Sequence, residues 1–298
     1  MKCNICPRGC NIDRNRGVGA CGATNTIKVA KIMLHHFEEP CISGENGSGA
    51  IFFSGCNLGC VYCQNKSISH TCNGIEMSVS ELANAMLDLQ SKGAHNINLV
   101  TPTHFALQIR QAIDEIRSEL KIPVVYNTSG YELPSEIEKM AGYVDVFLVD
   151  IKYFSSEASK KYSNAKDYFE HAFASFGTML KQQPKCVLDE NGIMKRGVIL
   201  RHLVLPTLRA DSKNMLGAIA DKYGVSDFKL SLMCQYTPEF CDEKYKELKR
   251  KITTFEYQSV LDFAVELGFD GYMQDFSSVG SIYTPDFLGE NKNEIKNS

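Results

Sequence analysis

Three cysteines carry the clearest chemical signal in the chain. Cys56, Cys60 and Cys63 are spaced C-x3-C-x2-C and follow directly on the apolar run 50–53. Thiolates are the usual ligands of iron–sulfur clusters. Three thiolates can occupy three irons of a four-iron (4Fe-4S) cluster and leave the fourth iron open to a small molecule. The alternative is a zinc knuckle, but zinc sites usually pair their cysteines as C-x2-C. The spacing therefore favours a cluster that does chemistry as well as carrying electrons.

Strands and helices must position the loop that carries the three cysteines. The sequence predicts them as apolar runs that alternate with helical patterns. Strands are predicted near residues 50–54, 96–100, 122–127, 144–149, 197–204, 228–233 and 270–275. Helices are predicted between them, two of which open with the capping boxes Ser78-x-x-Glu81 and Thr253-x-x-Glu256. This alternation indicates an α/β fold whose parallel strands form a partial or full (β/α) barrel. In barrels the active site lies at the carboxyl ends of the strands, and the cysteine loop follows the first of them.

Polar side chains stand at the ends of several later strands. Asn127 follows the third strand, Asp150 and Lys152 follow the fourth, and Arg201 lies in the fifth. Each of them alone has an ordinary structural explanation, such as a surface ion pair or a packing residue. Their common place at one end of successive parallel strands predicts that they line the same site as the cysteine trio.

The trio and its surroundings resemble the radical S-adenosylmethionine (SAM) superfamily. That resemblance implies an oxidoreductase in which the open iron binds SAM and one electron cleaves its sulfonium bond, giving a 5′-deoxyadenosyl radical. It also implies that Tyr62 lies beside the adenine. SAM needs acceptors for its ammonium group, a cation or donor for its carboxylate, and partners for its ribose. Asn127, Asp150, Lys152 and Arg201 offer those groups.

Residues 50–275 look most like pyruvate formate-lyase activating enzymes, which are glycyl-radical activases. In that family an Asp-x-Lys contacts the amino acid part of SAM, and this maps onto Asp150 and Lys152. The fifth strand of the family, an Arg followed by apolar residues and Pro, maps onto 201–206. The resemblance implies abstraction of a hydrogen atom from a glycine of a partner enzyme. Modification of another protein, a peptide or a metabolite is an alternative, and so is a non-catalytic electron carrier or interaction protein.

The chain departs from the activase pattern in two places. Activases usually carry Gly-Gly-Glu after the second strand to hold the SAM ammonium, whereas this chain has Thr-Pro-Thr-His at 101–104. Activases with additional clusters insert the extra cysteines after the C-x3-C-x2-C motif, whereas here the extra cysteines precede it. The residue that binds the ammonium group is therefore not identified by the resemblance.

A second group of cysteines lies near the start of the chain. Cys3, Cys6, Cys10 and Cys21 stand in a glycine-rich stretch, and four thiolates suit either zinc or a second iron–sulfur cluster. Residues 1–48 are thus expected to form a cysteine-rich metal-binding segment. Residues 49–288 are expected to form the barrel, and the polar residues 289–298 a disordered tail.

Composition limits the classes of partner and the cellular location that we expect for this chain. A net charge of −3 and a pI near 6.2 give no indication of nucleic acid or an anionic membrane surface as partner. Twelve cysteines without an apolar signal segment favour the reducing cytoplasm, with thiols that bind metal. A basic run at 244–251 is typical of a solvated helix face. The alternative is a docking patch for an acidic electron donor such as flavodoxin or ferredoxin.

Overall fold

A curved, mostly parallel sheet forms the centre of the protein. The computed structural model describes residues 2–274. Its strands run in the order β10-β9-β8-β6-β5-β4-β2-β1-β3, and β7 pairs with β8 alone. The parallel strands are β2 (Ser48–Phe53), β4 (Ile97–Val100), β5 (Val124–Thr128), β6 (Val146–Asp150), β8 (Met194–Leu203), β9 (Lys229–Met233) and β10 (Gly271–Met273). Because no ladder joins β10 to β3 within residues 2–274, the sheet is a partial barrel.

The seven strands expected from the sequence are all present, and three further strands extend the sheet. β1 (Ile27–His35) pairs antiparallel with β2, β3 (Ile75–Met77) pairs antiparallel with β1, and β7 (Val187–Leu188) is a short hairpin partner of β8. The expected cysteine-rich segment 1–48 therefore contributes a full strand to the sheet. The expected tail 289–298 lies outside the described residues.

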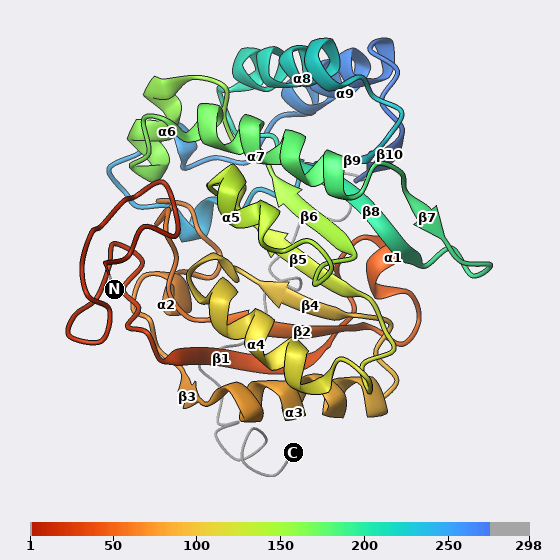
Figure 1. Ribbon diagram of the computed structural model, residues 1–298. Helices are drawn as coiled ribbons and strands as arrows, with labels where there is room; N and C mark the ends of the chain where they lie inside the picture. The colour runs from red at the N-terminus through yellow and green to blue at the C-terminus, as the bar shows by residue number, and fades with distance from the viewer. Residues whose placement is uncertain (1, 275–298) are drawn as a thin grey trace.

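Helices cover the outer face of the sheet (Figure 1). The longer ones are α3 (Val79–Ser91), α4 (Ala106–Ile116), α6 (Ser156–Ser163), α7 (Tyr168–Gln182), α8 (Arg209–Tyr223) and α9 (Thr254–Glu266). The short ones are α1 (Pro40–Ser43), α2 (Lys66–Ser69), α5 (Pro134–Glu138) and the 3-10 turns η1 (Thr103–Phe105), η2 (Pro238–Phe240) and η3 (Lys246–Leu248). Both expected capping boxes are confirmed: Ser78 with Glu81 opens α3, and Thr253 with Glu256 opens α9.

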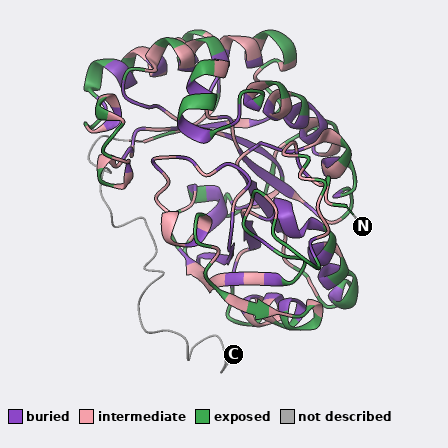
Figure 2. Ribbon diagram, turned by 90° about the vertical axis from the view of Figure 1, so that its left-hand side faces the viewer, coloured by how far each residue is buried: buried purple, intermediate pink, exposed green. Residues whose placement is uncertain are grey.

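The hydrophobic core has an outer and an inner part. Alternate strand residues such as Phe53, Leu99 and Phe147 pack outward against the helices in the main buried cluster. The strand residues on the other face of the sheet, among them Val125 and Leu148, pack inward in a smaller cluster. Ile42 of α1 belongs to that inner cluster, so α1 covers one end of the concave side. In Figure 2 the strands are buried along most of their length, and exposed residues lie on the outward surfaces of the helices.

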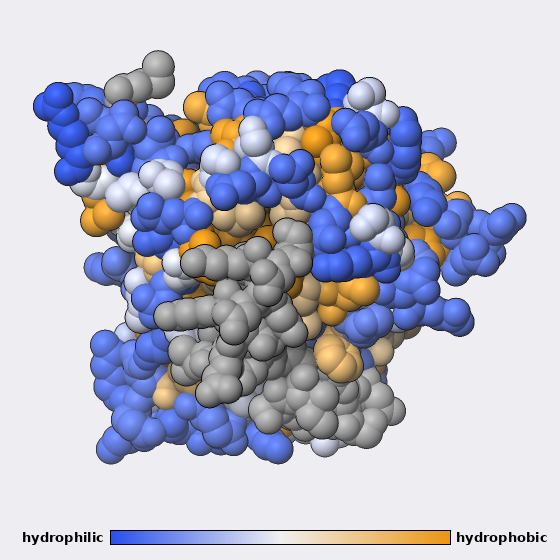
Figure 3. Space-filling view, turned by 90° about the horizontal axis from the view of Figure 1, so that it is seen from below, coloured by the Kyte–Doolittle hydropathy of each residue, from blue (hydrophilic) through white to orange (hydrophobic). Residues whose placement is uncertain are grey.

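The molecular surface is mixed in polarity. Hydrophilic residues dominate the rim of the face shown in Figure 3, and hydrophobic residues are more frequent toward its middle. Among the described helices, none combines the length and apolar character required to cross a membrane.

Candidate active site at the carboxyl ends of the strands

A cavity of about 260 Å³ lies inside the concave side of the sheet. The structure brings together around it the residues that the sequence singled out on separate strands and loops. They are Cys56, Cys60, Cys63, Tyr62, Asn127, Asp150, Lys152 and Arg201. The N-terminal quartet Cys3, Cys6, Cys10 and Cys21 is absent from the described residues that line this cavity.

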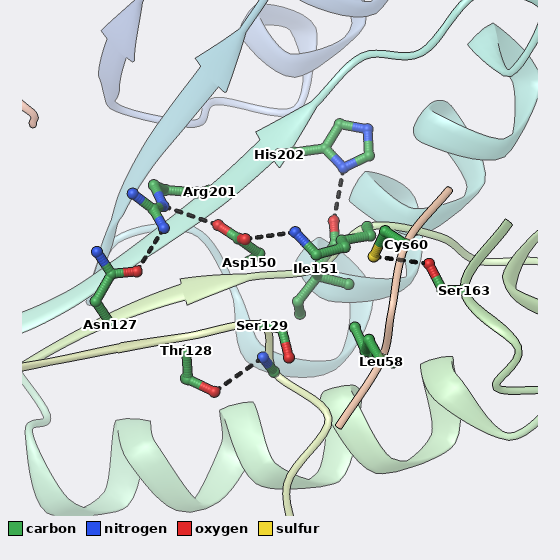
Figure 4. Close-up of polar contacts among 12 residues, drawn as sticks. Leu58, Cys60, Asn127, Thr128, Ser129, Asp150, Ile151, Ser163, Arg201 and His202 are labelled. Atoms are coloured by element: carbon green, nitrogen blue, oxygen red, sulfur yellow. Dashed lines mark hydrogen bonds and ion pairs between the residues drawn. The ribbon is translucent and has the colours of Figure 1, made fainter. Parts of the chain in front are cut away.

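The three cysteines lie on the loop that follows β2. Cys60 is buried, and the Ser163 hydroxyl donates a hydrogen bond of 2.9 Å to its sulfur (Figure 4). The Leu58 amide donates to the Cys56 sulfur at 3.4 Å. Burial raises the pKa of the Cys60 thiol to about 12, so its thiolate requires a compensating positive charge nearby. Iron bound there would supply such a charge and would displace the thiol protons.

The donor set around the cavity fits a cluster with one open corner. Among the described lining residues, the trio supplies all the cysteines. A structural zinc site usually closes with four Cys or His ligands, whereas the trio supplies three cysteines. A four-iron cluster instead takes one thiolate on each of several irons. The trio therefore suits a four-iron cluster and leaves one iron for another ligand.

Asp150 and Arg201 form the centre of a charged network beside the trio (Figure 4). Arg201 Nε donates to Asp150 Oδ1 at 2.8 Å, and its NH2 group donates to Asn127 Oδ1 at 2.6 Å. Lys152 Nζ lies 2.5 Å from Asp150 Oδ2. Burial alone would raise the pKa of Asp150, but Arg201 and Lys152 outweigh it and lower the pKa. Asp150 is thus held ionised at neutral pH.

Glu38 is a site residue that the sequence reasoning missed. It follows β1, and its side chain lines the cavity beside the network. Its Oε2 accepts from Arg201 NH1 at 2.9 Å, and its Oε1 accepts from the amides of Asn98 and Asn127 at 3.0 and 3.1 Å. The charges of Glu38, Arg201, Asp150 and Lys152 alternate in sign along this chain of contacts. Such a network is preorganised because each partner fixes the next.

Tyr62 lies at the start of a hydrogen-bond chain that ends on the sulfur of Cys60. Its hydroxyl lies 2.7 Å from that of Tyr153, which in turn lies 2.8 Å from Ser163 Oγ. Ser163 then donates to Cys60. Burial strongly raises the pKa of both tyrosines, so both remain neutral. The Tyr62 ring lines the cavity, and its position next to an adenine stays a prediction.

The segment that replaces Gly-Gly-Glu is mostly structural. Thr103 donates to the buried carboxylate of Glu132 at 2.6 Å, and His104 Nε2 lies 2.8 Å from the carbonyl of Ser54. Thr101 lines the cavity with a left-handed backbone (φ 59°), a conformation that is rare for a β-branched residue. Strain of this kind is often retained at functional sites. Glu38, rather than a residue of 101–104, supplies an additional carboxylate to the cavity.

The basic run at 244–251 is partly neutralised. Lys249 pairs with Glu243 at 2.7 Å, and Arg250 pairs with Glu256 at 2.7 Å. The first pair is exposed at Glu243 and contributes little to stability, whereas Glu256 of the second pair is buried. Docking of an electron donor on this run stays a prediction.

A cavity at the carboxyl ends of parallel strands, with three cysteines on the first strand's loop, defines the site of a radical SAM enzyme. Residues 50–189 match the radical SAM superfamily, so this part of the chain is a radical SAM domain. A Methanocaldococcus jannaschii protein named as uncharacterized is 28% identical over 280 residues, which cover 90% of this chain and 75% of the relative. The pyruvate formate-lyase-activating enzyme of Clostridium pasteurianum is 26% identical over 188 residues, which cover 60% of this chain and 71% of the relative.

Solved structures with low sequence identity also match. SuiB of Streptococcus suis bound to S-adenosylmethionine has a TM-score of 0.49 at 9% identity, over 74% of this chain and 48% of SuiB. A radical SAM methyltransferase from Sphaerobacter thermophilus has a TM-score of 0.48 at 10% identity, over 76% of this chain and 66% of that enzyme. The chain thus spans about half the length of SuiB.

Proposed function

We propose that the protein abstracts a hydrogen atom from a glycine of a partner enzyme, as glycyl-radical activases do. The observation that carries the proposal is the Asp150–Lys152 pair beside the cysteine trio in one cavity, because an Asp-x-Lys in this place is the activase pattern. The similarity to the C. pasteurianum activating enzyme supports it. The non-catalytic alternative is set aside, because the superfamily consists of enzymes.

Cys56, Cys60 and Cys63 would hold the cluster, and the charged network would hold the amino acid part of SAM. When both are bound, they supply one-electron cleavage of the sulfonium bond and a carbon radical that abstracts hydrogen. Lys152 would donate to the SAM carboxylate, and Asp150 would accept from its ammonium group. Glu38 extends the set of acceptors where Gly-Gly-Glu is missing.

The chain's own residues contribute orientation and exclusion of water. Arg201 makes three hydrogen bonds, to Asp150, Glu38 and Asn127, so the acceptors are fixed before a ligand enters. The side chains of Asp150 and Arg201 are only 16% and 15% exposed, so their charges are weakly screened by solvent. Charges held in a partly dry cavity act more strongly on a ligand than the same charges in water.

A second candidate keeps the radical chemistry and changes the substrate to another protein, a peptide or a metabolite. Glu38 favours it, because its carboxylate lines the cavity beside Arg201 and could also pair with a substrate cation. In both cases the reducing electron would come from a carrier such as flavodoxin or ferredoxin. A cytoplasmic location remains part of the proposal.

The test is anaerobic incubation of the reconstituted protein with SAM, dithionite and candidate glycyl-radical enzymes, followed by EPR. A glycyl radical on one candidate, absent when its radical glycine is changed to alanine, is the expected result. SAM cleavage without a protein radical on any candidate would favour the second substrate class. Absence of SAM cleavage would overturn both.

A further inference from the structure

We propose that the N-terminal quartet, Cys3, Cys6, Cys10 and Cys21, binds a second iron–sulfur cluster that passes electrons to the cluster of the trio. The relay role rests on the proposed function, whereas the metal site does not. The quartet lies in residues 2–26, which precede β1 and contain neither a helix nor a named strand. The argument for a site comes from the arrangement of the thiols, the backbone around them, and their place next to the loop of the trio.

The four thiols are gathered in one region. A Cβ atom placed on Gly19 would lie 3.4 Å from the Cys10 sulfur and 3.7 Å from the Cys21 sulfur. The amide of Asn11, directly after Cys10, donates to the Cys3 carbonyl at 2.9 Å, and the amide of Gly9, directly before Cys10, donates to the Cys6 carbonyl at 3.1 Å. The amide of Ala20, next to Cys21, donates to the Cys10 sulfur at 3.2 Å. Cys10 is therefore close in space to the backbone of the other three.

Turns of the backbone hold this arrangement. The amide of Cys3 donates to the carbonyl of Ile12 at 2.7 Å, and the amide of Gly9 donates to the carbonyl of Cys6 at 3.1 Å. Gly9 has a φ of 50°, which a residue with a side chain rarely adopts. A segment of this kind buries little apolar surface, so a bound metal can supply the free energy that orders it.

The choice between zinc and a cluster follows from what each requires. Zinc needs four sulfurs at about 2.3 Å from one point. A four-iron cluster binds each thiolate through a different iron and can also exchange an electron, which zinc cannot. The Cys21 carbonyl accepts from the Cys56 amide in the loop of the trio, so a redox-active group suits this place better than zinc.

The quartet lies directly against the loop of the trio. The amide of Cys56 donates to the carbonyl of Cys21 at 3.2 Å, so one hydrogen bond joins a residue of each cysteine set. Gly55 permits this approach, because a Cβ there would lie 2.4 Å from the Cys21 oxygen. Arg8, inside the quartet, donates to the carbonyls of Asn57 at 2.6 Å and Leu58 at 3.3 Å. The two sets are thus held together by a main-chain hydrogen bond at Cys21 and by side-chain hydrogen bonds from Arg8.

This placement gives an electron path from the surface to the cavity. Cys3 and Cys10 are partly exposed, whereas Cys60 is buried. A low-potential one-electron carrier would give one electron to the quartet's cluster, which would pass it to the trio's cluster and return to its oxidised state. No bond forms or breaks at the quartet, and the carrier is the species oxidised.

The metal content of the triple variant Cys56→Ala/Cys60→Ala/Cys63→Ala tests the site. After anaerobic reconstitution, this variant should retain about four irons and four sulfides per chain, against about twice that in the wild type. Dithionite should give it an EPR signal that does not respond to SAM. Zinc in place of iron would overturn the proposal, and so would the absence of both metals.

A second variant keeps the test informative if the triple variant does not fold. Cys10→Ser should lose about half of the iron and sulfide, whereas the control Cys186→Ser, at a thiol outside both sets, should lose none. Retention of the full iron content by Cys10→Ser would overturn the site. A failure of the proposed function would be seen separately, as a wild type that holds both clusters but does not cleave SAM.

Discussion

Asp150 and Arg201 are directly opposed in the register of β6 and β8, and their side chains meet at 2.8 Å inside the barrel. The strand register thus brings two residues that are 51 positions apart in the sequence into one ion pair. Lys152 and Glu38 extend this pair at either end. The electrostatic character of the cavity is therefore set by strand pairing as much as by residue type.

Replacing Asp150 with Ala should weaken SAM binding by about tenfold to a hundredfold, because a hydrogen bond to a charged group is worth about 1.5–3 kcal/mol. The iron content should stay near that of the wild type, since Asp150 bonds to Arg201 and Lys152 rather than to the cysteines. Calorimetric titration of the reconstituted variant with SAM measures the effect. Unchanged affinity would show that Asp150 does not contact SAM.

Replacing Cys60 with Ala should abolish SAM cleavage and the SAM-dependent change in the cluster's EPR spectrum. The reason is that two thiolates from the trio would remain to hold a cluster that needs three. Cys186→Ala serves as the control, because Cys186 lies apart from the cavity-lining residues. SAM cleavage by the Cys60 variant would refute the assignment of the trio.

Replacing Ser163 with Ala should lower the reduction potential of the trio's cluster by tens of millivolts. Hydrogen bonds to cluster sulfurs favour the more negative, reduced state, and a loss of about 1 kcal/mol corresponds to roughly 40 mV for one electron. Ser159→Ala is a matched control, since Ser159 is equally buried on α6 but bonds to the Ser156 carbonyl. Potentiometric titration followed by EPR gives the comparison, and equal potentials in both variants would contradict the role of Ser163.

The buried carboxyl of Glu132 should make stability fall as pH rises toward 7 and beyond. Burial raises its pKa to about 7, despite hydrogen bonds from Thr103, Thr128 and Tyr126 that lower it. Between the unfolded pKa of about 4.3 and the folded one, the folded state binds more protons, so the free energy of unfolding decreases with pH. From pH 6.5 to 8 this single group should cost about 0.8 kcal/mol.

Glu132→Gln should remove that decrease, which urea unfolding of both proteins at the two pH values would measure. Buried histidines such as His104 and His202, whose pKa values are lowered, make stability rise with pH in the same interval, and comparing the two proteins cancels their contribution. An equal pH dependence in wild type and variant would show that Glu132 ionises normally in the folded state.

The sequence predicted the parallel strands and two helix starts, because apolar period and capping boxes are local signals. It did not reveal β3 and β7, which have three and two residues and present no repeating pattern. It also missed β1, most of whose residues are half-buried rather than alternating clearly between buried and exposed.

The site was predictable where its residues follow parallel strands. Glu38 could not be found in that way, because it follows an antiparallel strand that precedes the barrel. Its partner Arg201 is 163 residues later, and only the curvature of the sheet brings them together. Likewise, nothing in the local sequence shows that Ser163 bonds to Cys60, 103 residues away.

The contacts of Arg8 also bear on how the protein is made. Arg8 donates to the carbonyls of Ser163 and Asn164, which are 155 and 156 residues later in the chain. At about 5–20 residues per second, a ribosome needs roughly 8 to 30 seconds to synthesise that interval. During this time the four early cysteines have been synthesised but cannot dock, so their thiols are open to metal ions and oxidants. On the proposal that the quartet binds a metal, the order of synthesis allows metal capture by the N-terminal segment before the assembly of the barrel.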